Sequence, residues 1–133
     1  MEQKRPGAWA PGIADGDSPA SLVVDELTGG VRVLRFSGEL DVAVAPDLLP
    51  RVPDLVSGAA GLVFDLTAVT FFDSAGVRLV DRFARECGRD GVAFAVVASP
   101  GTPPARVLEI VGFGPPLVTA DLGTALAAVN DPA

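Results

Sequence analysis

The sequence predicts a single α/β domain in which a mixed β-sheet is covered by helices. Two short apolar runs, GLVFDL at residues 61–66 and VAFAVVAS at residues 92–99, are bounded by turn-forming residues, and an amphipathic helical pattern lies between them. Short runs that are apolar throughout are typical of parallel strands buried under helices. We expect the order β-β-α-β-α-β-α-β-α, and 133 residues are enough for one hydrophobic core.

The domain is expected to begin with a β-hairpin. Residues 1–20 are rich in Pro, Gly, Ala and Asp and lack apolar periodicity, which predicts a flexible tail before a domain over residues 21–130. Within that domain, SLVVDEL at 21–27 and VRVLRFSG at 31–38 predict two strands. The Gly29-Gly30 pair between them predicts the turn of a hairpin.

A first helix is expected over residues 46–56, in a broken form. Its apolar residues recur at helical spacing, and Pro46 suits a first helical turn. Pro50 and Pro53 contradict a regular helix, because an interior proline removes a backbone donor at a cost of about 3 kcal/mol. We therefore predict a kinked or shortened helix here.

The clearest helical pattern follows Ser74. On a helical wheel, one arc is apolar and the opposite arc is basic. The apolar arc contains Gly76, Leu79, Val80, Phe83, Ala84 and Cys87, and the basic arc contains Arg78, Arg82, Arg85 and Arg89. Gly88 and Gly91 are expected to end this helix.

The remaining elements follow the strand at 92–99. The segment 103–112 predicts a short helix with Val107, Leu108 and Val111 facing inward. Residues 115–130 predict a short strand followed by a last helix.

Composition excludes several classes of function. The chain has no His and one Cys, Cys87, so a Ser-His-Asp or Cys-His catalytic arrangement and a Cys/His zinc site are excluded. A net charge of −7 and a pI near 4.3 argue against binding nucleic acid, whose phosphates require basic surfaces. No apolar run approaches the ~18 residues of a membrane span, and the first residues do not resemble a secretory signal. We expect a cytoplasmic protein that is not an enzyme and holds no metal or cofactor.

The junction within TAVTFFDSAGVRLV, residues 67–80, is the candidate site. A strand that ends at Asp73-Ser74 and leads into a helix places Ser74 at or beside the helix N-cap. Ser74 is then a capping residue, an exposed modification site at the carboxyl end of a strand, where a phosphoryl group would meet the helix N-terminus, or both, since a capping serine can also be modified. A nucleophilic serine would need a G-x-S-x-G turn and a His, and F-D-S-A-G provides neither.

Three motifs together resemble one known family. The central motif is VFDLTAVTFFDSAGVRLVDRFAR, preceded by RFSGELDVAVAP and followed by RVLEIVGFG. In this order and spacing they resemble the STAS-domain anti-sigma factor antagonists, over about residues 22–129. The resemblance implies a STAS-like domain with a mixed sheet and a layer of helices, in agreement with the element order above.

The resemblance also implies a mechanism called partner switching. The unmodified antagonist binds an anti-sigma factor that is also a serine kinase, phosphorylation of a loop serine ends the interaction, and a serine phosphatase restores it. Carried over by position, Ser74 matches the phosphoacceptor, Asp73 matches the acidic residue before it, and Asp41 matches a second acidic residue near the loop.

Four neighbours of Ser74 are further candidates for partner binding, namely Ala75, Gly76, Arg78 and Arg82. Gly76 leaves room for a partner or packs closely against the sheet, and the arginines form a contact face or simply a solvated one. The family often has a second serine where this chain has Ala75, and a threonine where it has Val44. Ser74 is therefore the sole acceptor expected in the loop.

An alternative function belongs to a different class. A structural STAS subunit of a larger assembly, such as a stress-sensing complex or a lipid transporter, would use Ser74 only as a cap and contact residue. We expect a monomer or a weak dimer in either case.

Overall fold

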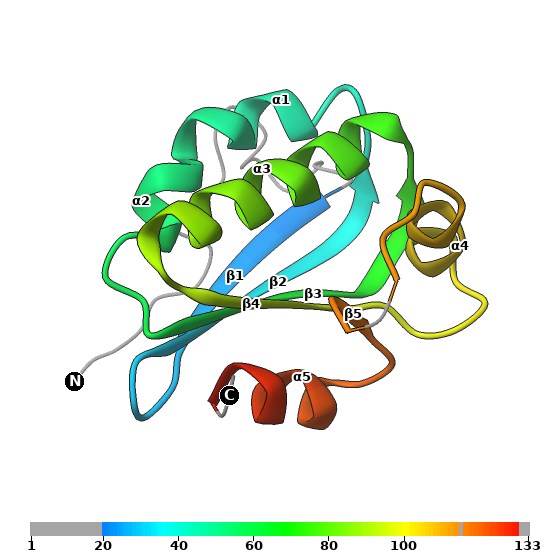
Figure 1. The fold of residues 1–133 in the computed structure, drawn as a ribbon. Helices are drawn as coiled ribbons and strands as arrows, with labels where there is room; N and C mark the ends of the chain where they lie inside the picture. Colours follow the sequence, from blue (N-terminus) through cyan, green and yellow to red (C-terminus); the bar gives the residue numbers. More distant parts are fainter. Residues whose placement is uncertain (1–19, 115, 131–133) are drawn as a thin grey trace.

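The β-sheet of the protein is mixed and contains five strands within the residues that the structure describes, 20–114 and 116–130 (Figure 1). In this computed structural model the strand order is β1-β2-β3-β4-β5; β1 and β2 are antiparallel, and the other neighbours are parallel. The strands are β1 (Ala20–Glu26), β2 (Val31–Leu40), β3 (Gly61–Phe72), β4 (Ala93–Val97) and β5 (Val118–Thr119). The helices are α1 (Ala45–Leu48), the 3-10 helix η1 (Leu49–Arg51), α2 (Val52–Val56), α3 (Ser74–Asp90), α4 (Pro103–Ile110) and α5 (Leu122–Asn130).

The expected fold class and element order are confirmed. The hairpin pairs Ala20 with Gly38 at one end and Glu26 with Arg32 at the other. The predicted tail over residues 1–20 lies outside the described residues except for Ala20, which is the first residue of β1. The tail therefore stays a prediction.

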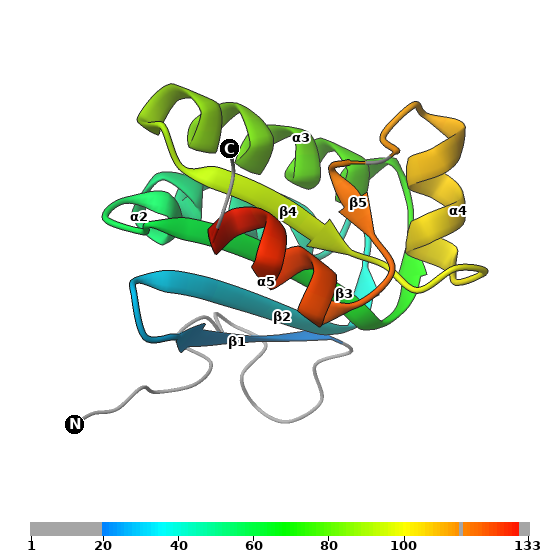
Figure 2. The same cartoon turned by 60° about the horizontal axis from the view of Figure 1, so that its bottom comes forward.

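Helices cover both faces of the sheet, but unequally. The helices α1, α2 and α3 lie over one face, and α5 packs against β3 and β4 on the other (Figures 1 and 2). The larger core lies under α1 to α3, where the Phe64 ring centroid is 4.6 Å from that of Phe36 and 4.9 Å from that of Phe83. The smaller core lies under α5 and includes Val63 and Ala125.

Strand β3 is longer than its apolar run suggests because it contains two irregularities. The pairing of β2 with β3 shifts between Arg35 and Ser37 and again between Gly38 and Glu39, with one extra β3 residue each time. The β3 side chains in the larger core are accordingly Leu62, Phe64, Leu66, Val69 and Phe72. Up to Leu66, every second side chain of β3 faces the larger core; after Leu66 the spacing of the core-facing side chains becomes three. The apolar run therefore ends at Leu66, although the strand continues to Phe72.

A buried carboxylate lies at the first irregularity. Asp65 is 5% exposed, and its Oδ1 accepts hydrogen bonds from the Thr67 backbone N–H at 2.9 Å and from the Thr67 hydroxyl at 2.8 Å. These bonds satisfy the carboxylate and hold the extra residue of the strand in place.

The predicted broken helix is confirmed. Its three prolines lie at the starts of three short segments, Pro46 in α1, Pro50 in η1 and Pro53 in α2. Each proline occupies a first-turn position, where its missing N–H has no helical partner to lose. The chain therefore remains helical through α1, η1 and α2, with a break at each of the two boundaries, and α1 and α2 both pack against α3.

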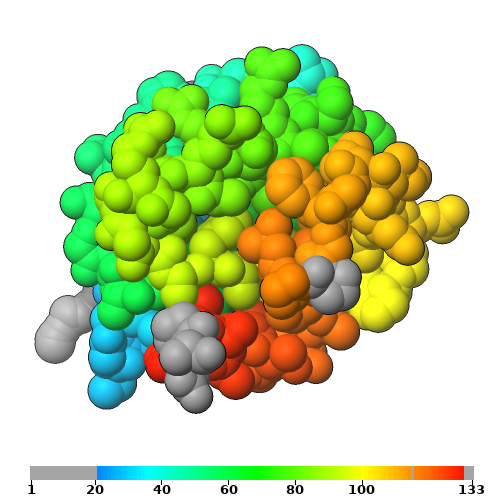
Figure 3. Space-filling view, in the orientation of Figure 1, coloured from blue at the N-terminus to red at the C-terminus, as the bar shows by residue number. Residues whose placement is uncertain are grey.

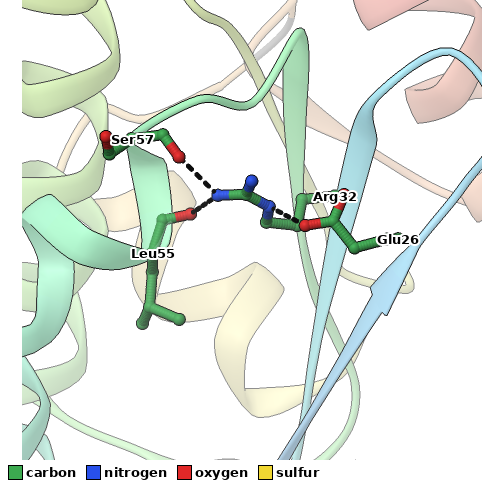
Figure 4. Close-up of polar contacts among 4 residues, drawn as sticks. All are labelled: Glu26, Arg32, Leu55 and Ser57. Carbon is green, nitrogen blue, oxygen red and sulfur yellow. Dashed lines mark hydrogen bonds and ion pairs between the residues drawn. The ribbon is translucent and has the colours of Figure 1, made fainter. Parts of the chain in front are cut away.

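The end of α2 is attached to the sheet by a side chain of β2. The Arg32 guanidinium donates from Nη1 to the backbone oxygens of Leu55 at 2.8 Å and Ser57 at 2.9 Å, and from Nε to Glu26 (Figure 4). The carbonyls at the end of a helix have no partner within it, and Arg32 supplies one.

Two boundary predictions are wrong. Gly88 lies inside α3, which ends at Asp90 and is followed by Gly91 with φ of +71°, a left-handed conformation that glycine adopts without strain. Val111 does not face inward: it follows the last residue of α4 and is 51% exposed, whereas Leu108 is fully buried. The helix ends before its periodic pattern could bring Val111 round to the core.

Candidate functional site

The candidate site lies where β2 and β3 end side by side. Leu40 pairs with Phe72 across these parallel strands, and each is the last residue of its strand. Asp41 and Asp73 therefore follow neighbouring positions at the carboxyl edge of the sheet, where sites in parallel sheets commonly form. Figure 1 shows both strand ends turning up toward α1 and the start of α3.

Ser74 is the first residue of α3, and its side chain is exposed. The N-cap is Asp73, whose Oδ1 accepts a hydrogen bond from the Ala75 backbone N–H at 2.9 Å. The interpretation of Ser74 as the capping residue is therefore wrong. Asp73 performs that role, which leaves the Ser74 hydroxyl beside the cap without a structural task at the helix start.

Asp41 shapes the turn that leads from β2 into α1. Its Oδ1 accepts from the Ala43 N–H at 3.0 Å, and its backbone oxygen accepts from Val44 at 3.0 Å and Ala45 at 2.8 Å. Val44 is the N-cap residue of α1, is 3% exposed and makes no side-chain capping bond. The apolar residue where the family often has threonine thus adds to the core, and Asp41 holds the turn.

A surface pocket of about 250 Å³ separates the start of α3 from α1. It is lined by Val42, Ala45, Pro46, Leu49, Ser74, Ala75 and Arg78. The sequence-predicted residues Ser74, Ala75 and Arg78 therefore share one cavity, whose opposite wall is apolar. Of the remaining predicted residues, Asp41, Asp73, Gly76 and Arg82 do not line this pocket.

Gly76 is buried and packs against the end of β3. A Cβ atom on Gly76 would lie 2.5 Å from Cε1 and 2.7 Å from Cδ1 of Phe72, closer than real Cβ contacts allow. The close-packing alternative for Gly76 is confirmed, and a direct contact with a partner stays a prediction. The approach of α3 to Phe72 helps to fix the position of the helix start.

The arginines of α3 fall into two groups. Arg85 Nε lies 2.7 Å from Asp81 Oδ2, and Arg89 Nη1 lies 3.9 Å from Glu86 Oε1. Arg78 and Arg82 form no ion pair with any residue in the described parts of the chain. Figure 3 shows α3 forming much of the upper front surface of the molecule.

Sequence reasoning missed two exposed apolar side chains near this edge. Val42 is 69% exposed at the pocket, and Phe71 is 48% exposed beside the end of β3. Phe71 points outward because the second irregularity of β3 turns Phe72 inward instead. The sequence does contain one indication, the two consecutive aromatic residues before Asp73. Because successive side chains of a strand point to opposite faces, one of the two must face away from the core.

The chemistry available at this edge is that of a binding surface. Among residues 20–114 and 116–130, no group of three metal-ligating side chains is arranged to hold a metal ion. The Cys87 thiol is buried in the large core, and burial, reinforced by Asp90 and Glu86, raises its pKa to about 12. In the same described ranges, no helix is long and apolar enough to cross a membrane.

Comparison with known proteins gives a consistent result. Residues 23–123 match the STAS domain family. The chain is 33% identical over 98 residues to the anti-sigma-F factor antagonist RsfB of Mycobacterium tuberculosis, a match that covers 73% of this chain and 77% of RsfB.

Solved structures agree with the sequence comparison. A crystal structure of an anti-sigma factor antagonist from Mycobacterium paratuberculosis is similar with a TM-score of 0.74 and 30% identity, covering 84% of this chain and 95% of that one. The anti-sigma factor antagonist SpoIIAA in its unphosphorylated form shares the fold, with a TM-score of 0.69 and 18% identity over 84% of this chain and 97% of that one. The chain therefore belongs to the STAS-domain family of anti-sigma factor antagonists.

Proposed function

We propose that this protein is an anti-sigma factor antagonist that binds an anti-sigma factor serine kinase through the edge formed by α1 and the start of α3. Phosphorylation of Ser74 ends the interaction, and a serine phosphatase restores it. In this role the protein is a cytoplasmic regulator of transcription and not an enzyme.

The observation that carries the proposal is the setting of Ser74. Its side chain is exposed, it makes no capping bond, and it lines an apolar pocket beside Val42. A kinase can reach such a hydroxyl, and a partner can bury the same apolar surface. Interfaces of this kind have an apolar centre with a polar rim, and Asp41, Asp73, Arg78 and Arg82 would supply the rim.

The charge introduced by a phosphate is large enough to act as a switch. A phosphoserine carries about −1.5 to −2 charges at pH 7 and would lie next to Asp73. An uncompensated charge buried in an interface costs about 2 to 5 kcal/mol, which corresponds to roughly 30-fold to several thousand-fold in affinity. The phosphate at a helix N-terminus is tolerated by the domain itself, so the modification need not unfold it.

Phosphorylation is tested with a purified anti-sigma factor kinase, ATP and intact mass measurement. We expect the mass of one phosphoryl group to be added to the wild-type chain and none to Ser74→Ala. Addition of the same mass to Ser74→Ala would refute Ser74 as the acceptor. Absence of modification together with stable incorporation into a larger complex would favour the structural STAS subunit.

The effect on binding is tested by calorimetry with the same kinase. Ser74→Ala keeps position 74 uncharged and is expected to bind nearly as well as the wild type. Ser74→Asp adds a charge at the pocket and is expected to bind at least about 30-fold more weakly. Equal affinities for the two variants would refute the charge argument.

A further inference from the structure

We propose that Arg78 binds the phosphate of phosphorylated Ser74 within the same molecule, and that this pair closes the pocket between α1 and α3. The inference rests on the proposed function only in taking Ser74 as the modified residue. It assigns to Arg78 an internal role in the phosphorylated state.

The position of Arg78 carries this inference. Ser74 and Arg78 are four residues apart on α3, which places them on the same side of the helix with Cβ atoms about 5–6 Å apart. Side chains on a helix lean toward its N-terminus, which is the direction in which Ser74 lies from Arg78. Both residues line the same pocket, and among the described residues that line it Arg78 is the one charged side chain.

Arg78 is also available for a new partner. Arg32, by contrast, is bound to two carbonyls and to Glu26, Arg35 pairs with Asp25, and Arg85 pairs with Asp81. In the described part of the chain, the ion pairs do not include Arg78. A guanidinium that has no ion pair among the described residues, one turn from a phosphorylated side chain, is well placed for the two parallel hydrogen bonds of an Arg–phosphate pair.

The surroundings of Ser74 favour such a pair. The Asp73 carboxylate already takes the Ala75 N–H and would repel a phosphate next to it. Asp41 lies at the same edge, and the α1 wall of the pocket, formed by Ala45, Pro46 and Leu49, has no charged side chain. Arg78 is thus the cation at this pocket that can offset the two carboxylates.

The pair would change the surface that a partner meets. In the pair, the Arg78 side chain would lie along the pocket that it lines together with Ser74, Val42 and Leu49. Phosphorylation then blocks the apolar cavity as well as adding charge. A partner that fills the pocket with an apolar side chain would lose the cavity and would also meet the added charge of the phosphate.

The test uses the full chain with phosphoserine installed at position 74 during synthesis, so that no kinase is required. The second pKa of the phosphate, ordinarily about 6, is measured by phosphorus NMR titration. A guanidinium in contact favours the dianion, so the pKa is expected to be lower by roughly half a unit with Arg78 than in Arg78→Gln. Arg82→Gln removes the same charge one turn further away and is expected to leave the pKa nearly unchanged.

Closure of the pocket is measured in the same samples through the methyl signals of Val42 and Leu49. These signals are expected to shift on phosphorylation when Arg78 is present and to shift much less in Arg78→Gln. Equal pKa values in wild type and Arg78→Gln, or equal changes in Arg78→Gln and Arg82→Gln, would overturn the inference. Because the phosphate is installed without a kinase, failure of a kinase to modify Ser74 would count against the proposed function alone.

Discussion

The two ends of α3 are built differently, although one continuous helix contains both. At the N-terminal end, Asp73 caps the helix and Gly76 packs on Phe72, while Arg78 has no ion-pair partner in the described structure. At the C-terminal end, Arg85 and Arg89 are paired within the helix. The N-terminal end therefore combines a fixed backbone with a charged side chain that, among the described residues, is free to bind a partner. This combination suits a binding edge, because rigid positioning lowers the entropic cost of association.

The largest expected difference between the two ends concerns their glycines. Gly76→Ala would drive a Cβ into the Phe72 ring and is expected to lower the free energy of unfolding by about 2–3 kcal/mol. Gly88→Ala is the matched control, because no atom that the structure describes packs within 4 Å of its Cβ position and alanine is the better helix former. It should raise stability by about 0.5–1 kcal/mol. Urea denaturation measures both, and equal effects would contradict the packing at Gly76.

Removal of the N-cap is the next largest effect. Asp73→Ala loses the bond to the Ala75 N–H and a negative charge at the helix start, at an expected cost of about 1.5 kcal/mol in the free energy of unfolding. Asp73→Asn keeps an oxygen acceptor and should lose well under half of that. Thermal denaturation of the two variants measures the difference. A loss in Asp73→Asn equal to that in Asp73→Ala would mean that the hydrogen bond contributes little.

The C-terminal end of α3 contains the buried thiol of Cys87, which should make the stability of the protein depend on alkaline pH. Because the folded-state pKa of Cys87 is raised from 9.0 to about 12, the stability that the neutral buried thiol contributes is complete below pH 9 and is lost as pH rises above it. The expected loss is about 1 kcal/mol by pH 10. Denaturation at pH 8 and pH 10 measures it, and Cys87→Ala should remove this part of the pH dependence. An unchanged difference in that variant would point to other groups.

The smallest expected effect distinguishes the arginines. Arg85→Gln removes an exposed pair with Asp81 and should lower the free energy of unfolding by no more than about 0.5 kcal/mol. Arg78→Gln removes no ion pair of the described structure and should leave the stability of the unmodified protein unchanged. A loss in Arg78→Gln larger than in Arg85→Gln, measured by denaturation, would show that Arg78 has a structural role.

Much of this architecture could be predicted from local patterns. The Gly-Gly hairpin, the broken helix at its prolines and the amphipathic α3 each depend on residues close together in the chain. The extent of β3 could not be predicted in the same way, because its irregularities are defined by pairing with β2. The last residue of α4 likewise depends on where the chain leaves the core, which local periodicity does not show. For this reason Val111 was wrongly predicted to face inward.

The candidate site was only partly visible in the sequence. Ser74 stood out from its position between a strand and a helix, but serine and aspartate are both good N-caps, and only the structure shows that Asp73 takes the role. The pocket depends on how α1 packs beside α3, a contact between residues about 30 positions apart that no local pattern encodes. Val42 was missed for this reason, and Phe71 was missed because the irregularity that turns it outward is defined by pairing with β2.

The irregularities of β3 also constrain how proteins built like this one can diverge. Deleting the extra residue at either irregularity would restore regular pairing with β2 and remove the local bend of β3, which would shift the end of the strand and the contact of Phe72 with Gly76. Insertions and deletions in this stretch are therefore disfavoured, since they would displace Ser74 relative to α1. Lineages that acquire new partners should do so by exchanging side chains at fixed length around the pocket, where Val42 and Arg78 can vary without disturbing the strand.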